Sequence, residues 1–121
     1  MNTNQWHHRD LDAWQTSMDL AVAIYSLTQK LPSTEKFGLV AQMRRAAVSI
    51  PSNIAEGAAR GTSPEFARFL HIARGSVAEL ETQLELVERL DLTRVEPSVY
   101  QKLSAIRKML SGLIRKITVP A

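Results

Sequence analysis

One segment of the chain, residues 66–87, restricts the fold more than any other. Its apolar residues follow one another in alternating steps of four and three, namely Phe66, Leu70, Ala73, Val77, Leu80, Leu84 and Val87. This spacing places them in one stripe along an α-helix, as in helices that pack at a shallow angle. A stripe of this length needs other helices to cover it, so the segment predicts a helical bundle.

Three further segments have helical spacing of apolar residues, at residues 11–31, 35–59 and 97–117. Pro32 and Pro97 mark two of the breaks, and Thr62 with Glu65 has the spacing of a capping box at the start of the third helix. Four amphipathic helices with short connections predict an all-α protein, an antiparallel up-and-down four-helix bundle. We expect a single domain over residues 1–121, in which residues 1–10 form a mobile N-terminal tail.

The first of these segments has two apolar rows. One row contains Leu11, Trp14, Met18, Ala21, Val22 and Tyr25, and the second contains Leu20, Ile24, Leu27 and Leu31. Together they are wider than one bundle core requires, and the second row in particular predicts an apolar face that is covered by another copy of the chain. A homo-oligomer is therefore expected.

Composition excludes several classes of protein. The chain contains no cysteine, so thiol catalysis, thiolate metal sites and disulfides are excluded. The first residues are polar and lack the apolar core of a signal peptide, and no stretch approaches the roughly 18 apolar residues of a membrane span. We therefore expect a cytoplasmic protein that does not associate with a membrane.

Pro51 stands in the middle of the second predicted helix. It cannot donate a hydrogen bond to the carbonyl of Ala47, so the helix should bend or loosen there, at a cost of ~3 kcal/mol in an isolated helix. At 100° per residue, polar residues gather on one side of this helix. We interpret them as a structural polar seam, buried against another helix or another subunit, with a ligand or catalytic site as the alternative. The seam consists of Arg45, Ser49, Ser52, Asn53, Glu56 and Arg60.

Signals of catalysis are weak. His7, His8 and His71 do not have the spacing of metal ligands, and no glycine-rich phosphate loop is present. Glu56 and Glu79 would suit a carboxylate pair, but nearby arginines make an ion-pair network the simpler interpretation. We expect no catalytic residue, no metal and no cofactor, and hence no enzyme.

Charge is unevenly distributed along the chain, whose net charge is +3. Residues 77–96 carry six acids and two bases, a balance of −4, whereas residues 101–121 carry five bases and no acid, a balance of +5. These five bases are Lys102, Arg107, Lys108, Arg115 and Lys116. Two hypotheses follow: the last helix binds RNA or DNA, or the chain is a protein-interaction or scaffold module in which acids such as Glu79, Glu81, Glu85 and Glu88 pair with that helix.

Small and aromatic residues of the third helix allow two further predictions. Gly75 and Ser76 predict a close approach of the second helix. A glycine inside a helix costs ~1 kcal/mol in stability, and a neighbouring backbone that needs the space would explain why this cost is accepted. Phe66 and Phe69 are expected to be core or interface aromatics, since basic residues do not alternate with them as on an RNA-reading surface.

The stretches "QMRRAAVSIPSNIAEG" and "FLHIARGS", together with the segment around Trp14, carry a family resemblance. Over residues 11–92 the chain resembles the bacterial four-helix bundle family related to proteins encoded by intervening sequences of 23S rRNA genes. A distant relative is the accessory variability determinant of diversity-generating retroelements, a basic protein that works with a reverse transcriptase and RNA. The resemblance implies a homopentamer arranged as a barrel, in a family most of whose members have no established biochemical activity.

Overall fold

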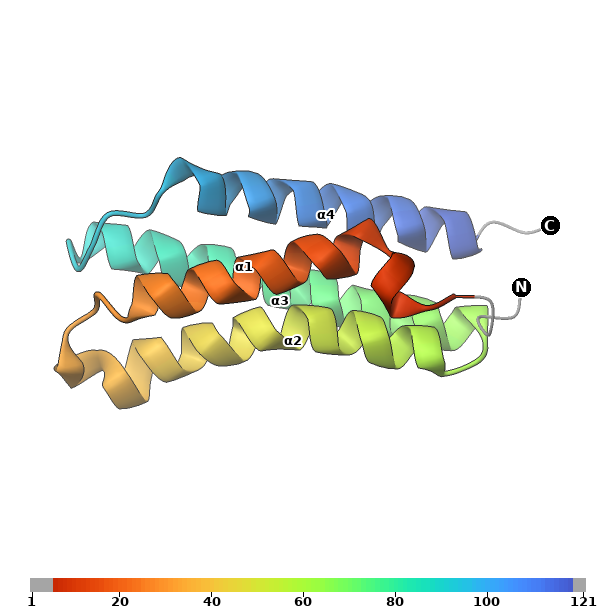
Figure 1. Cartoon of the computed structure of the whole chain (residues 1–121), viewed down its shortest axis with the longest axis horizontal. Coiled ribbons are helices and arrows are strands. Elements are labelled where there is room, and N and C mark those ends of the chain that lie inside the picture. The colour runs from red at the N-terminus through yellow and green to blue at the C-terminus, as the bar shows by residue number, and fades with distance from the viewer. Residues whose placement is uncertain (1–5, 119–121) are drawn as a thin grey trace.

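The computed structural model describes residues 6–118, which form four long helices. They are α1 (Asp12–Thr28), α2 (Ala41–Ala59), α3 (Ser63–Arg89) and α4 (Pro97–Thr118). Successive helices run in opposite directions (Figure 1), which confirms the predicted all-α, antiparallel four-helix bundle. Three short elements complete the fold: η2 (His8–Asp10), η3 (Ser33–Glu35) and the π-helix η4 (Lys36–Val40).

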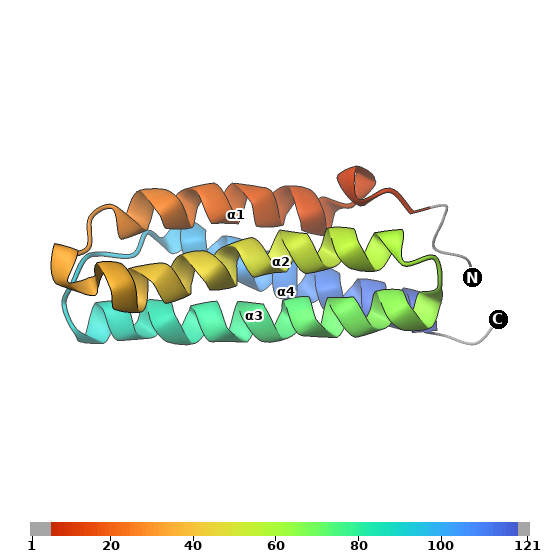
Figure 2. The same ribbon diagram turned by 90° about the horizontal axis from the view of Figure 1, so that it is seen from below.

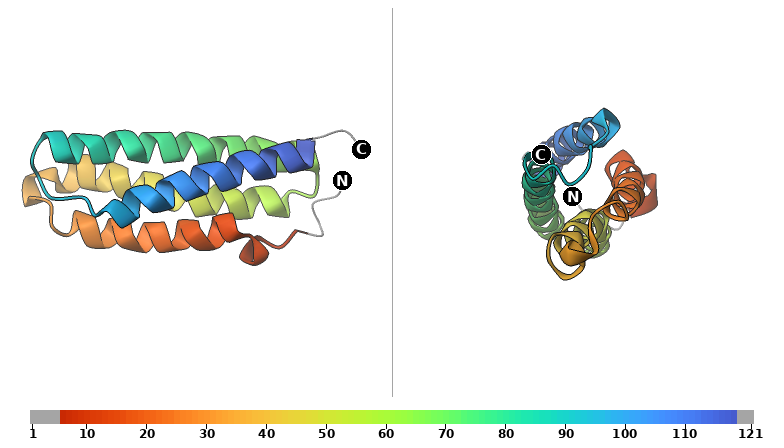
Figure 3. Two further views of the ribbon diagram at one scale, coloured as in Figure 1. Left: turned by 90° about the horizontal axis from the view of Figure 1, so that it is seen from above. Right: turned by 90° about the vertical axis from the view of Figure 1, so that its left-hand side faces the viewer.

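The helices follow one another around the bundle axis, so α1 and α3 lie on opposite sides (Figure 3). The predicted stripe of α3 lies at the centre, where Phe66, Leu70, Val77, Leu80 and Leu84 are completely buried. Within residues 6–118, no helix is long and apolar enough to cross a membrane.

The two apolar rows of α1 have roles opposite to those expected. Leu20 and Ile24 are completely buried in the core of the chain itself, so the prediction that their row is covered by another copy was wrong. The other row supplies the exposed side chains Met18, Val22 and Tyr25, which are 41%, 68% and 42% exposed. The row that contains Leu20, Ile24 and Leu27 fills the centre of the bundle, because it lies on the side of α1 that faces the other helices.

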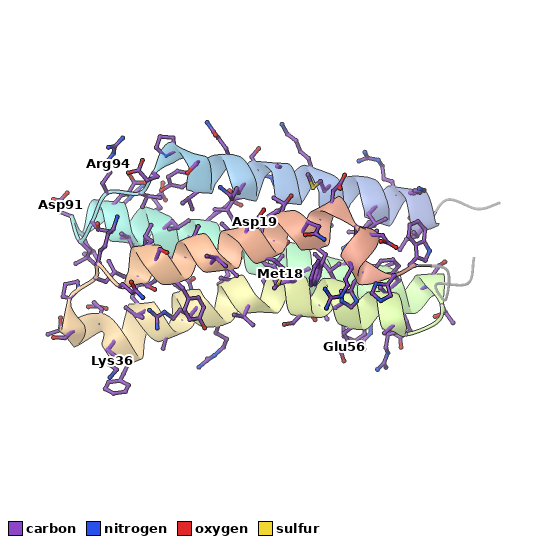
Figure 4. The ribbon with its side chains drawn as sticks, viewed as in Figure 1. Met18, Asp19, Lys36, Glu56, Asp91 and Arg94 are labelled. Carbon is purple, nitrogen blue, oxygen red and sulfur yellow. The ribbon has the colours of Figure 1, made fainter. Side chains whose placement is uncertain are left out.

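The second predicted helix, residues 35–59, begins differently from the prediction. Residues Lys36–Val40 form a π-turn, and α2 itself starts at Ala41. In a regular helix Lys36 would lie on the face of Met43, which is completely buried. The wider π-turn rotates Lys36 out to solvent, and Figure 4 shows it at the end of the bundle, outside the core.

Pro51 does not interrupt α2. The residue is buried, the helix continues through it to Ala59, and its ribbon is bowed (Figure 1). Bending at an internal proline is the expected response to the missing donor and to the crowding by its ring.

The close approach between α2 and α3 occurs at Gly57 and not at Gly75. A Cβ on Gly57 would lie 2.7 Å from Cβ of Phe69 and 3.0 Å from Cδ1 of Phe66, whereas a Cβ on Gly75 would meet nothing within 4 Å. The prediction for Gly75 was therefore wrong, because this residue is exposed on the outer side of α3 and does not contact α2. Its neighbour Ser76 is buried at the contact between the two helices, as expected.

The start of α3 has the predicted cap. The Oγ1 of Thr62 accepts a hydrogen bond from the backbone N–H of Glu65, with the two atoms 3.4 Å apart. Pro64 occupies the first turn, where its missing N–H costs nothing. Gly61, with φ of 91°, supplies the left-handed residue that the turn between α2 and α3 requires.

The segment predicted as an N-terminal tail lies partly within the described residues. Residues 1–5 are outside them, while His8–Asp10 form a turn of 3₁₀-helix before α1. The Trp6 ring meets Phe66 edge to face at a centroid distance of 6.1 Å, and the Nζ of Lys116 lies 5.1 Å from the Trp6 ring centroid. Trp6 thus lies beside the end of α4, with both described chain ends at one end of the bundle (Figure 2).

Candidate nucleic-acid interface

The five basic residues predicted to contact nucleic acid differ in their availability. Lys102 is half-buried, and the other four side chains are exposed. Arg107 is engaged within the chain, because its Nη1 donates to both carboxylate oxygens of Glu81, at 2.9 and 2.8 Å. The charge of Arg107 is therefore largely compensated by α3.

Lys108, Arg115 and Lys116 form no ion pair with a carboxylate among residues 6–118. Lys116 is held over the ring of Trp6, an arrangement favoured by the ring quadrupole. Lys108 and Arg115 are seven residues apart and share one face of α4. Among the exposed cations of this helix, these two have neither a carboxylate nor an aromatic ring as a partner within residues 6–118.

Helix α3 adds a cationic group, the guanidinium of Arg74, to this face. Nη1 of Arg74 donates to Oγ of Ser111 at 3.2 Å, and Nη2 of Arg74 lies 3.0 Å from Nδ1 of His71. Ser111 is one turn before Arg115 on α4, so the two helices present their polar groups side by side. We call this surface the basic face and define it by His71, Arg74, Lys108, Ser111 and Arg115.

Sequence reasoning found Lys108 and Arg115 but not His71 and Arg74. A signal was present, because residues 66–78 contain no acid while His71 and Arg74 follow Arg68 at steps of three. The charge of α3 thus changes sign halfway along the helix, and its basic half lies beside the basic half of α4.

The other half of the α3–α4 surface is acidic. Glu81, Thr82, Glu85, Glu88 and Tyr100 line a groove of about 440 Å³. The hydroxyl of Tyr100 donates to Glu88, and burial, followed by this hydrogen bond, raises the pKa of Tyr100 to about 12. The carboxylates of this half repel phosphate groups, so on the α3–α4 surface the basic face is the part that suits a polyanion.

The acids named in the scaffold hypothesis have different partners. Glu81 pairs with Arg107 of α4, Glu85 lies 3.8 Å from Arg89 of its own helix, and Glu88 accepts from Tyr100. Within residues 6–118 Glu79 has no ion pair. Pairing inside the chain therefore leaves the basic face uncovered.

The predicted polar seam is divided by the fold. Ser49 and Asn53 are half-buried: Oγ of Ser49 lies 2.9 Å from Oγ of Ser76, and Nδ2 of Asn53 donates to the carbonyl and the hydroxyl of Ser49, at 2.8 and 2.9 Å. The other four residues lie at the surface of the single chain: Arg45, Ser52, Glu56 and Arg60. Figure 4 shows Glu56 at the outer edge of α2, and within residues 6–118 it has no ion pair.

Phe69 is covered by two guanidinium groups. The ring is 7% exposed, and the Cζ atoms of Arg60 and Arg68 lie 5.3 and 4.8 Å from its centroid. Glu65 contacts both arginines, and the hydrogen bond from Arg68 lowers the pKa of its carboxyl. Phe69 is thus a core-edge aromatic and is not available as a platform for bases.

No group of three or more His, Asp or Glu side chains within residues 6–118 is arranged to hold a metal ion. His7 and His8 stack on each other at 4.8 Å, and His8 meets the ring of Trp14 edge to face. Burial lowers the pKa of His8, with smaller contributions from the charges of His7 and Arg9. These contacts pack the first described residues against α1.

Comparison with known proteins agrees with this architecture. No curated protein matches the chain. A solved structure from Bacteroides thetaiotaomicron, described as a protein with unknown function from the S23 ribosomal protein family, is 29% identical to this chain. The match covers 85% of this chain and 95% of that one, with a TM-score of 0.77. A family model described as 23S rRNA-intervening sequence protein matches residues 9–112, nearly all of the bundle, and the chain therefore belongs to that family.

Proposed function

We propose that this protein is a non-enzymatic homo-oligomer, a pentamer as the family resemblance implies, that binds RNA or DNA through its basic face. The observation that carries the proposal is the cluster of Arg74, Lys108 and Arg115, which have no carboxylate partner among residues 6–118. Such a cluster on two adjacent helices suits the phosphate backbone and reads no particular base.

A single chain offers too few cations for tight binding. Several copies in one assembly multiply them, because after the first contact each further contact is intramolecular. Contacts to phosphate groups do not distinguish RNA from DNA, so the proposal covers both. A cytoplasmic location, which the lack of cysteine permits, would give access to either nucleic acid.

The test is a fluorescence-anisotropy titration against a structured RNA and a duplex DNA at two salt concentrations. A variant with Arg74, Lys108 and Arg115 replaced by glutamine should bind more weakly and with a salt slope smaller by up to about 3. The matched control replaces Lys30, Lys36 and Arg94, three exposed cations at the other end of the bundle, and removes the same charge.

If the control variant loses as much affinity as the basic-face variant, binding depends on net charge alone and the proposed interface is wrong. If the wild-type protein does not bind either nucleic acid at low salt, the nucleic-acid function is wrong.

A protein-interaction or scaffold role is the second candidate. It is favoured by large apolar side chains at the surface, notably Val22 at 68% and Phe37 at 89% exposure. Phe37 is held outward by the π-turn, and an aromatic residue in this position suits a protein partner better than a phosphate backbone. This role gains weight if low-salt titrations detect no nucleic-acid binding.

A further inference from the structure

We propose that copies of this chain join through the outer faces of α1 and α3, with Val22 of one copy packed against Gly75 of the next. The inference rests on the homo-oligomer of the proposed function and is independent of nucleic-acid binding. It assigns the partner, a second copy, and the two surfaces that meet.

The α1 side of this contact is an apolar ridge formed by Met18, Val22 and Tyr25, at steps of four and three. Val22 is the most exposed of the three, at 68%. Beside the ridge, an apolar groove of about 400 Å³ lies between α1 and α2, and Figure 4 shows Met18 at this boundary. Exposed apolar residues in one row on a helix are typical of a surface that is covered in the assembled protein.

The α3 side is a notch at Gly75. The residue is exposed, and a Cβ there would meet nothing within 4 Å, so packing within the chain does not require a glycine. A glycine inside a helix costs about 1 kcal/mol relative to alanine. Ile72, one turn earlier, is 42% exposed and supplies an apolar side chain at the edge of the notch. A missing side chain beside an exposed isoleucine suits the approach of a ridge from another helix.

Ridge and notch lie at the same height along the bundle. Met18 and Ala21 line the α1–α2 groove together with Val48. Ser49, the next residue of α2, contacts Ser76, which follows Gly75. Val22 and Gly75 are therefore level with each other on opposite sides of the molecule.

Helices α1 and α3 also run in the same direction (Figures 1 and 2). In a closed ring all copies point the same way, so a contact must join parallel segments at equal height, whereas unequal heights would produce a helical filament. The α1–α3 pair meets both conditions.

The two faces also have an angle that favours closure. On a wheel of 100° per residue, the α1 ridge and the α3 face around Ile72 and Gly75 each lean toward α2 by roughly 35° from the direction opposite the core. Because α1 and α3 lie on opposite sides of the bundle (Figure 3), the angle between the two faces is less than 180° on the side of α2. Contacts at such an angle curve successive copies toward a closed ring.

This geometry turns α2 toward the inside of the ring and α4 toward the outside. The exposed half of the polar seam, including Arg45 and Glu56, then lines the interior, and Lys108 and Arg115 stay uncovered. Charges at the contact are also compatible. Asp19 has no ion pair within residues 6–118. In the proposed contact it would lie at the height of Ile72, about one turn from Arg68 of the next copy, which within its own chain pairs with Glu65.

Cysteine cross-linking tests the contact directly, because the natural chain has no cysteine. In a variant with Val22→Cys and Gly75→Cys the two thiols of one chain are on opposite sides, so a disulfide can form only between copies. We expect oxidation to give a ladder on a non-reducing gel that ends at the ring size. The matched control, Val22→Cys with Lys108→Cys, should give no ladder.

The other outcomes separate the two proposals. If light scattering gives the wild-type mass as 13.5 kDa at micromolar concentration, the homo-oligomer itself is wrong. If the protein is an oligomer but the Val22→Cys, Gly75→Cys variant does not cross-link, the α1–α3 contact is wrong and the homo-oligomer stands. The same holds if Val22→Cys alone gives disulfide-linked dimers efficiently, because such dimers indicate a two-fold contact between α1 helices. Gly75→Leu gives a second measure: it should lower the assembled mass while the helical circular dichroism is retained.

Discussion

The hydroxyl oxygens of Ser49 and Ser76 lie 2.9 Å apart and join the middle of α2 to the middle of α3. The Ser49 hydroxyl also accepts a hydrogen bond from the amide of Asn53, and either serine can donate in the bond between the two hydroxyls. The polar groups next to Pro51 are thus paired with one another and with a neighbouring helix. This arrangement fixes the register of α2 against α3 where a proline weakens the helix.

Replacing Asn53 by alanine should therefore destabilise the fold. The change removes both hydrogen bonds of the amide and leaves Ser49 with one partner fewer, so the free energy of unfolding should fall by about 1–2 kcal/mol. Chemical denaturation measures the effect. Ser52→Ala, an exposed change one residue away, should stay within about 0.5 kcal/mol of wild type. Equal stability of the two variants would argue against the network.

The two helices should be intolerant of any side chain at Gly57. A Cβ there would clash with Phe69 and Phe66, neither of which can withdraw without opening the core, so Gly57→Ala should cost about 1–3 kcal/mol. Gly112→Ala is the matched change in α4, where the nearest atom, from Arg115, would be 3.8 Å away. That variant should gain up to about 1 kcal/mol from helix propensity. Thermal melting of both variants checks the pair, and a stabilised Gly57→Ala would contradict the packing.

Stability should fall at high pH because of Tyr100. Burial and the bond to Glu88 raise its pKa to about 12 in the folded chain, against about 10 in an unfolded one. The unfolded chain thus loses the phenol proton first, so the stabilisation is complete below pH ~10 and is lost as the pH rises toward 12. Urea denaturation across this range should show a smaller loss for Tyr100→Phe than for wild type. Identical pH profiles would exclude the linkage.

Freeing Arg107 should strengthen polyanion binding. Glu81→Gln removes the carboxylate that holds the guanidinium, so affinity for RNA should rise and the salt slope should increase by about 1. Glu85→Gln makes the same charge change but releases Arg89 of α3, at the acidic end, and should have a smaller effect. Anisotropy titrations of the two variants at two salt concentrations compare them. A larger effect of Glu85→Gln would place the contact outside the basic face.

The periodicity of the apolar residues was sufficient to predict the four helices. Apolar residues at steps of three and four, as from Phe66 to Val87, form one continuous face in an α-helix and in no other regular structure. The periodicity could not decide which row of α1 faces the core. Both rows are apolar, and the choice between Leu20 and Met18 depends on where the neighbouring helices lie. Lys36 is a charged residue at a position of the apolar stripe, and this indicates that the helix is not regular there. It does not indicate that the irregularity is a π-turn.

The candidate site was only partly predictable for a similar reason. The charge count of the last helix identified Lys108 and Arg115, but the helix that lies beside them decides what they do. Glu81 of α3 compensates Arg107, while Arg74 of α3 adds a cation next to Arg115. The same applies to the glycines, since Gly57 and Gly75 both lie inside helices and only the neighbouring ring of Phe69 distinguishes them.

The contact between Trp6 and Lys116 has a practical consequence for protein engineering. It brings the first and last described turns of the chain to the same end of the bundle, beside the start of α3 (Figure 2). A polypeptide fused to either end would leave from that end, and in a ring of parallel copies every fused cargo would emerge from one rim. The assembly would then display its cargoes as a one-sided cluster, with the opposite rim, formed by the connections around Phe37 and Arg94, free for attachment to a surface.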